Sequence, residues 1–160
     1  MRDTFELDGK SIKPGTSRIV DISLPQLHSD TEVFMPVHVI HGKREGPVLF
    51  LSAAIHGDEI NGVEIIRRIL SMSSIKRLRG TLLAVPLVNV FGFNAHTRYL
   101  PDRRDLNRCF PGKEAGSMAA RLAHIFLSEI VSRSDIGIDL HTAAIHRDNF
   151  PQIRADLKDP

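Results

Sequence analysis

The stretch that decides the fold is "VLFLSAAIHGDEINGVEIIRRIL", residues 48–70. It opens with a continuous apolar run over 48–55, which is typical of a strand covered on both faces. A short polar break, "HGDE", follows, and apolar residues then recur at helical spacing with Arg67 and Arg68 on the opposite side. These apolar positions are Ile60, Val63, Ile66 and Leu70. The pattern predicts a buried strand that turns sharply into an amphipathic helix.

Two further strands are expected in the same sheet. "GTLLAVPLV", residues 80–88, is a second buried run, so the chain reads strand, helix, strand, which indicates a right-handed parallel crossover. In "DIGIDLHT", residues 135–142, apolar residues alternate with polar ones. This alternation predicts a strand with Ile136, Ile138 and Leu140 on one face and Asp139 and His141 on the other.

The segments on either side show other patterns. "RIVDISLP" (18–25) and "VFMPVHVI" (33–40) alternate as half-exposed antiparallel strands do, and Pro36 favours an edge or bulged position for the second. Residues 89–112 lack periodicity over an unusual length, which favours a functional loop. A helix is expected at about 116–132. Its candidate buried residues are Met118, Leu122, Ile125 (or Phe126) and Ile130.

Length and patterning together predict one α/β domain over residues 1–160. Its central sheet is expected to be mixed and largely parallel, flanked by helices, with antiparallel strands in 1–46 and a metal-site core in 47–145. Hydrophobic residues make up 42% of the chain and charged residues 25%, which is enough for a real core.

Charge and cysteine content exclude several classes. The formal net charge of +2 gives no broad footprint for nucleic acid or an anionic membrane. The single cysteine, Cys109, has no partner for an internal disulfide, and no run of residues is apolar enough to cross a bilayer. Because the first ten residues lack the apolar core of a signal peptide, we expect a cytoplasmic location.

Polar residues follow the expected strands at one rim of the sheet. His56 comes just after the first buried strand, Asn89 after the second, and His141 at the end of the third. Ligands of open α/β sheets bind outside the carboxyl ends of the strands. His56 and Glu59 can face a common centre across the Gly57 turn, and His141 can join them through the sheet. Two histidines and one carboxylate form a catalytic zinc set.

Simpler interpretations exist for the same residues. Asp58 can cap the helix, and acidic residues in a first turn suit the helix dipole. An isolated H-x-x-E also arises by chance. We assign the remaining histidines to structural or surface positions; they are His28, His38, His41, His96, His124 and His146.

Four motifs in order, "HGDE" (56–59), "TRY" (97–99), "DLNRCFPG" (105–112) and "IDLHT" (138–142), resemble the succinylglutamate desuccinylase and aspartoacylase family. This family is related to the zinc carboxypeptidases, so the resemblance implies a zinc-carboxypeptidase-like fold. It also implies one Zn²⁺ per chain, held by His56, Glu59 and His141. By the same resemblance, Asn107 and Arg108 grip a substrate carboxylate.

The resemblance leaves two roles open. Arg98 matches the arginine that polarises the scissile carbonyl, although Arg103 or Arg104 could take this role, or could pair with Asp102 and Asp105 on an exposed loop. Asp139 shares a strand face with His141, so it could orient that ligand or serve as a structural carboxylate.

The resemblance implies a hydrolase that removes a succinyl or acetyl type N-acyl group from a small carboxylate-bearing amino acid. The family completes the reaction with a general-base glutamate downstream of the last histidine ligand, but no glutamate follows His141 here. We therefore expect the N-terminal portion of a larger enzyme, truncated at the C-terminus and weak or inactive by itself. The alternatives are a zinc carboxypeptidase acting on peptides and a non-catalytic metal- or anion-binding domain.

Overall fold

The computed structural model of the protein describes residues 2–27 and 29–156, so His28 lies outside the described residues. Its centre is a five-stranded sheet in the order β3-β4-β6-β5-β7. The strands are β3 (Thr16–Ser23), β4 (Phe34–His41), β6 (Arg79–Val85), β5 (Arg44–Ala53) and β7 (Ile136–Leu140). β4 pairs antiparallel with β3 and β6, whereas β5 pairs parallel with β6 and β7. The expected mixed α/β fold is confirmed.

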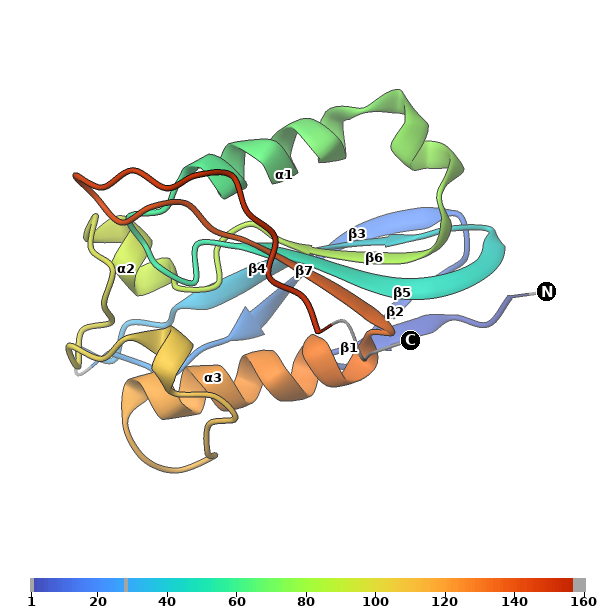
Figure 1. The fold of residues 1–160 in the computed structure, drawn as a ribbon. Coiled ribbons are helices and arrows are strands. Elements are labelled where there is room, and N and C mark those ends of the chain that lie inside the picture. The colour runs from blue at the N-terminus through green and yellow to red at the C-terminus, as the bar shows by residue number, and fades with distance from the viewer. Residues whose placement is uncertain (1, 28, 157–160) are drawn as a thin grey trace.

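Helices cover both faces of this sheet. Figure 1 shows α1 (Asn61–Ser71) above it and α3 (Met118–Glu129) below it. The smaller elements are the hairpin β1 (Phe5–Leu7) and β2 (Lys10–Ile12), the short helix α2 (Val90–Asn94), and the 3-10 helices η1 (Ser73–Arg77), η2 (Leu106–Arg108) and η3 (Val131–Arg133). Within the described residues, no helix has the length and apolar character needed to cross a membrane.

The core consists of two apolar clusters, one on each side of the sheet. The larger cluster joins the apolar residues of β3 and β4, which alternate as the sequence predicts, to α3. Phe126 rather than Ile125 belongs to the fully buried part of α3, together with Leu122. The smaller cluster packs Ile66 of α1 against Leu51 of β5 and Leu82 of β6. Each sheet face is thus covered by the helix whose apolar stripe points toward it.

Pro36 does not make β4 an edge strand, because β4 lies between β3 and β6. The register nevertheless explains how proline is tolerated. β4 pairs with β6 only over His38–His41, so Pro36 pairs with Asp21 of β3 and has no partner on the β6 side. A missing backbone N–H is acceptable in such a half-paired segment.

The interval 89–112 is not the structureless loop that its lack of periodicity suggests. It contains α2, which begins after Asn89, and η2, which begins after Asp105. The side chains of Asn89 and Asp105 accept hydrogen bonds from the backbone N–H groups of Gly92 and Asn107, respectively. Each helix is too short to show helical periodicity in sequence, so only its capping residue could reveal it.

Two expectations about the start of α1 are also wrong. Ile60 is 53% exposed, because it is the N-cap residue and lies before the first buried turn. Asp58 does not cap the helix, and its Oδ2 accepts instead from the backbone N–H of Ile145 at 3.2 Å. Asp58 therefore ties the α1 entrance to the segment that follows β7.

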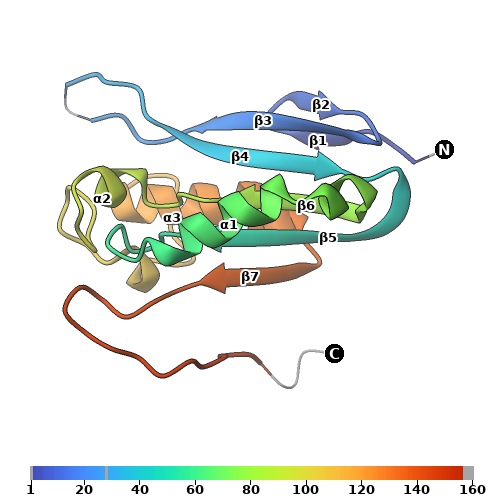
Figure 2. The same cartoon turned by 90° about the horizontal axis from the view of Figure 1, so that it is seen from above.

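One edge of the sheet is formed by β7. Figure 2 shows the chain leaving β7 and running back beside it, on the side away from β5. Ile136 and Ile138 share a strand face as expected, but they remain 52% and 46% exposed. The described chain thus leaves apolar surface along this edge.

The turn between β5 and α1 depends on the absence of a side chain at Gly57. A Cβ atom there would lie 2.0 Å from the carbonyl carbon of Gly92, inside the α2 backbone. We expect Gly57→Ala to lower the free energy of unfolding by about 1–3 kcal/mol, because two backbones must separate. Urea denaturation checks this, with the exposed Ser74→Ala as the control. Equal midpoints and slopes for the two variants would contradict the prediction.

Candidate metal centre

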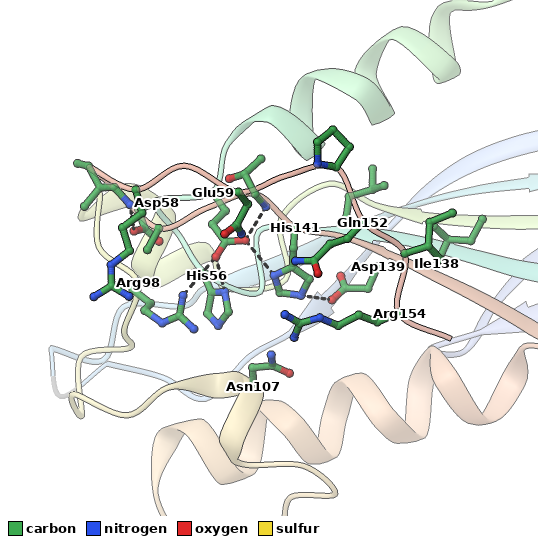
Figure 3. A pocket seen from close by; sticks show the side chains of 18 of the residues that line it. His56, Asp58, Glu59, Arg98, Asn107, Ile138, Asp139, His141, Gln152 and Arg154 are labelled. Atoms are coloured by element: carbon green, nitrogen blue, oxygen red, sulfur yellow. Dashed lines mark hydrogen bonds and ion pairs between the residues drawn. The ribbon is translucent and has the colours of Figure 1, made fainter. Parts of the chain in front are cut away.

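Three polar side chains meet at the carboxyl ends of β5 and β7. His56 and Glu59 lie in the turn between β5 and α1, and His141 follows β7 directly. Figure 3 shows all three pointing toward one another. Each offers a ligand atom, and these atoms lie within 4.8 Å of one another. The structure therefore brings together the three residues that the sequence selects, across an interval of 82 residues between Glu59 and His141.

The carboxylate of Glu59 is the centre of this group. Nδ1 of His56 lies 2.7 Å from its Oε1, and Nδ1 of His141 lies 2.9 Å from its Oε2. The backbone N–H of Thr142 also donates to Oε2 at 2.9 Å. Both imidazoles thus present the same ring nitrogen to one carboxylate.

The other ring nitrogen of each histidine faces a second carboxylate. Nε2 of His56 lies 3.1 Å from Oδ1 of Asp105, and Nε2 of His141 lies 2.6 Å from Oδ2 of Asp139. The hydroxyl of Ser52 in turn donates to Oδ1 of Asp139 at 2.7 Å. A carboxylate on the far nitrogen holds the tautomer that leaves the near nitrogen free for a metal.

This arrangement fits a metal ion. Two imidazole nitrogens and one carboxylate oxygen are the donors that borderline divalent ions prefer, and they already converge. His56 and Glu59 are almost completely buried, whereas the His141 side chain is 34% exposed. The group is therefore enclosed on the β5 side and open to solvent on the β7 side.

The mutual contacts shift both ionisable partners toward their charged forms. Burial by itself raises the pKa of Glu59, but hydrogen bonds from His141, His56 and Thr142 outweigh it and hold the pKa well below its usual range. Hydrogen bonds to Asp139 and Glu59 raise the pKa of His141 to about 10. In the metal-free protein, His141 is thus a cation at neutral pH.

Arginine and amide side chains extend the site beyond the three central residues. Arg98 donates to Oε1 of Glu59 at 3.2 Å and to Oδ2 of Asp105 at 3.1 Å. Arg98, Asn107 and Arg108 all line the pocket that contains the histidines. Neither Arg103 nor Arg104 is among the described residues that line this pocket. Of the three arginines, Arg98 is thus the one that lines the pocket beside Glu59.

The sequence patterns did not identify several residues of the site. Asp105 is expected there only as a partner of nearby arginines, although its place two residues before Asn107 matches a capping side chain. Ser52 could have been noticed as the one hydroxyl in the buried run 48–55. Gln152 and Arg154 reach the pocket from a segment without any periodic pattern, so no sequence signal pointed to them.

Comparison with known proteins first identifies a distant structure that shares this fold. The structure of a protein described as a carboxypeptidase A, from Shewanella denitrificans, has the same fold with a TM-score of 0.61. It is 14% identical, and the match covers 78% of this chain and 35% of that one. The likeness extends to the fold alone.

The family is more specific. Residues 45–160 match the model of the succinylglutamate desuccinylase/aspartoacylase catalytic domain, and the chain belongs to this family. It is 33% identical over 120 residues to the N-alpha-acetyl-L-2,4-diaminobutyric acid deacetylase of Halomonas elongata, covering 74% of this chain and 35% of that protein. A succinylglutamate desuccinylase/aspartoacylase structure from Rhodobacter sphaeroides is 29% identical with a TM-score of 0.74, covering 89% and 42%. The chain therefore spans less than half the length of these relatives.

The raised pKa of His141 gives a pH dependence to the stability of the metal-free chain. A base with its pKa raised from 6.5 to about 10 adds stability that is fully present below pH 6.5 and is lost as the pH rises through 10. We expect the difference in free energy of unfolding between wild type and His141→Gln to shrink along this range. Urea denaturation with a chelator at about pH 6, 8 and 10 measures it. A difference that stays constant or grows would refute the assignment.

Proposed function

We propose that the chain belongs to a zinc-dependent hydrolase that removes an N-acyl group, of the succinyl or acetyl type, from a small carboxylate-bearing amino acid. One observation carries the proposal. His56 and His141 turn their Nδ1 atoms toward Glu59, while a separate carboxylate holds the Nε2 atom of each. This arrangement is typical of metal ligands oriented from outside.

His56, Glu59 and His141 would hold the zinc ion, one per chain. A zinc ion in such a set supplies a Lewis acid that polarises an amide carbonyl and lowers the pKa of water to about 7. The chain's own contribution is to fix these three donors before the ion arrives, since Glu59 is buried and bound by four neighbours. Asp139 would keep the His141 ring in place.

The substrate would bind on the open side of this group. Arg108 and Asn107 lie on η2 and line the same pocket, where a guanidinium fork and an amide suit a carboxylate. Arg98 lies closer to the centre, within hydrogen-bond distance of Glu59, where its cation would stabilise charge that develops on the carbonyl oxygen.

Two alternatives remain for the activity. A carboxypeptidase acting on peptides would use the same donors and the same anion-binding pair. A non-catalytic metal- or anion-binding domain would hold an ion with the same donors and would turn over no substrate.

Zinc binding should release a proton. Since His141 is protonated at neutral pH in the metal-free protein and must be neutral to bind a metal, we expect about one proton to leave per zinc ion. Isothermal titration calorimetry at about pH 7.5, in buffers of different ionisation enthalpy, counts the protons. His141→Ala and His56→Ala should each lose stoichiometric zinc by elemental analysis. Full zinc retention in both variants would exclude the assigned site.

Substrate class separates the three activities. Zinc-loaded protein should cleave N-succinylglutamate, N-acetylaspartate or N-acetyl-2,4-diaminobutyrate faster than a short peptide. Cleavage of the peptide alone would support the carboxypeptidase. Tight zinc and anion binding without turnover of any substrate would support the binding domain.

Arg108 should act in binding the substrate carboxylate. We expect Arg108→Ala to raise KM by about 10-fold or more with a smaller change in kcat, because the lost contact exists in both the ground and the transition state. Arg103→Ala is the matched control, since Arg103 is an exposed arginine on the same loop that does not line the pocket. Equal effects of the two substitutions would argue against a specific role for Arg108.

A further inference from the structure

A second polar cluster lies at the end of the sheet opposite the metal centre, where β4 ends and where β5 and β6 begin. Figure 2 shows the N-terminal segment at this end, beside the turn from β4 to β5. Nη1 of Arg2 donates there to the carbonyl oxygens of Gly42 at 2.9 Å and Gly80 at 2.6 Å. Nη2 donates to the hydroxyl oxygen of Thr81 at 2.8 Å, and the carbonyl oxygen of Arg44 lies 3.3 Å from Nη1. The Arg2 side chain is only 9% exposed, so protein oxygen atoms replace most of its water.

The backbone presents these oxygen atoms because the strand pairing is irregular at this end. The β5–β6 register shifts between Arg44 and Val48, where β5 has more residues than β6. Such a bulge leaves backbone groups without partners in the sheet. Gly42 and Gly80 let the segments approach closely, since a Cβ atom at these positions would lie 2.2 Å and 2.1 Å, respectively, from a backbone carbonyl oxygen. The bulge and the two glycines together form a cage of acceptors.

Two buried side chains complete this cage. Thr81 and His41 are 1% and 3% exposed. Nε2 of His41 donates to the carbonyl oxygen of Asp3 at 2.9 Å, because a carbonyl group can only accept. Nδ1 of His41 lies 2.8 Å from the Thr81 hydroxyl, whose oxygen accepts from Arg2. The same buried network thus holds Arg2 and the residue that follows it.

The acceptors suit a planar guanidinium group better than an ammonium ion. Nη1 and Nη2 of Arg2 reach different acceptors at the same time, as the fixed fork of a guanidinium allows. Among the described residues, the carboxylate paired with Arg2 is that of Glu45. It lies 3.6 Å from Nε, and its side chain is 78% exposed. Recognition therefore depends mainly on neutral oxygen atoms that the backbone fixes.

We propose that this cluster is a guanidinium-binding site, which Arg2 occupies from within the chain. The site fastens the N-terminal segment to the starts of β5 and β6. It accepts a free guanidinium compound once the Arg2 side chain is removed. None of its residues belongs to the candidate metal centre or lines the pocket around it. The inference is therefore independent of the proposed function.

Three variants of the 160-residue chain are compared with wild type. Arg2→Ala removes the guanidinium group and leaves the acceptor cage in place. Arg2→Lys keeps a cation of similar reach but lacks the planar fork. Arg18→Ala is the matched control, because Arg18 is an exposed arginine on β3.

We expect Arg2→Ala to lower the melting temperature, Tm, by about 3–8 °C, because buried acceptors lose their donor. Methylguanidinium at millimolar concentration should restore much of this loss along a saturable curve, since a ligand that binds only the native state stabilises it. Methylammonium at the same concentration should restore none of it. Arg2→Lys should lose nearly as much as Arg2→Ala. Wild type and Arg18→Ala should show neither the loss nor the gain.

Binding itself is followed by NMR. Methylguanidinium should shift the backbone amide signals of Gly42 and Thr81 in Arg2→Ala but not in wild type, where the site is filled. A measurement on wild type alone supplements this titration. The guanidinium N–H protons of Arg2 should exchange slowly enough with water to be seen at neutral pH, in contrast to those of the exposed Arg18.

Several results would overturn the proposal. Methylguanidinium could give no saturable gain in Arg2→Ala, or methylammonium could give an equal one. An unchanged Tm in Arg2→Ala or in Arg2→Lys would also refute a site specific for guanidinium. If Arg2→Ala does not fold, the wild-type measurement decides, because Arg2 protons that exchange as fast as those of Arg18 contradict a caged side chain. Failure of the chain to bind zinc would overturn the proposed function and leave this inference intact.

Discussion

The site depends on one buried carboxylate, that of Glu59. An unpaired charge at this depth would cost several kcal/mol, so its position is tolerable only where donors surround it. The donors come from three separate segments: the turn after β5, the end of β7, and the segment that carries Arg98. The hydrogen bonds to the Glu59 carboxylate therefore fix how these three segments meet.

Parallel strand pairing makes this convergence possible. In the β5–β7 register, Ala53 pairs with Leu140, so the two strands end level with each other. His141 follows its strand at once, while His56 lies three residues past the end of β5 and reaches back through the Gly57 turn. Gly62 allows α1 to close over this point, because a Cβ atom there would lie 2.9 Å from the Cβ atom of Leu140. Small residues at the helix–sheet contact thus bring Glu59 between the two histidines.

The sequence predicts the parts of the fold that leave a periodic or local pattern of apolar and polar residues. The buried run before His56, the amphipathic pattern of α1 and the alternation in β3 all correspond to elements with a covered face. The position of His141 at a strand end follows from the same pattern. The supporting residues were harder to find, because Asp105 and His56 are joined only by the fold. Likewise, Asp58 carries a typical capping side chain, yet it bonds to Ile145, a contact that no local pattern encodes.

The charges at the centre of the site largely offset one another and leave a small negative excess. Glu59, Asp105 and Asp139 bring three negative charges, and Arg98 together with protonated His141 offsets two of them. Among these five side chains, one negative charge remains uncompensated. Exchange of the His141 proton for a divalent ion, as the proposed function requires, would remove this excess. In the proposed enzyme, the proton on His141 would thus occupy the electrostatic place of the metal until an ion replaces it.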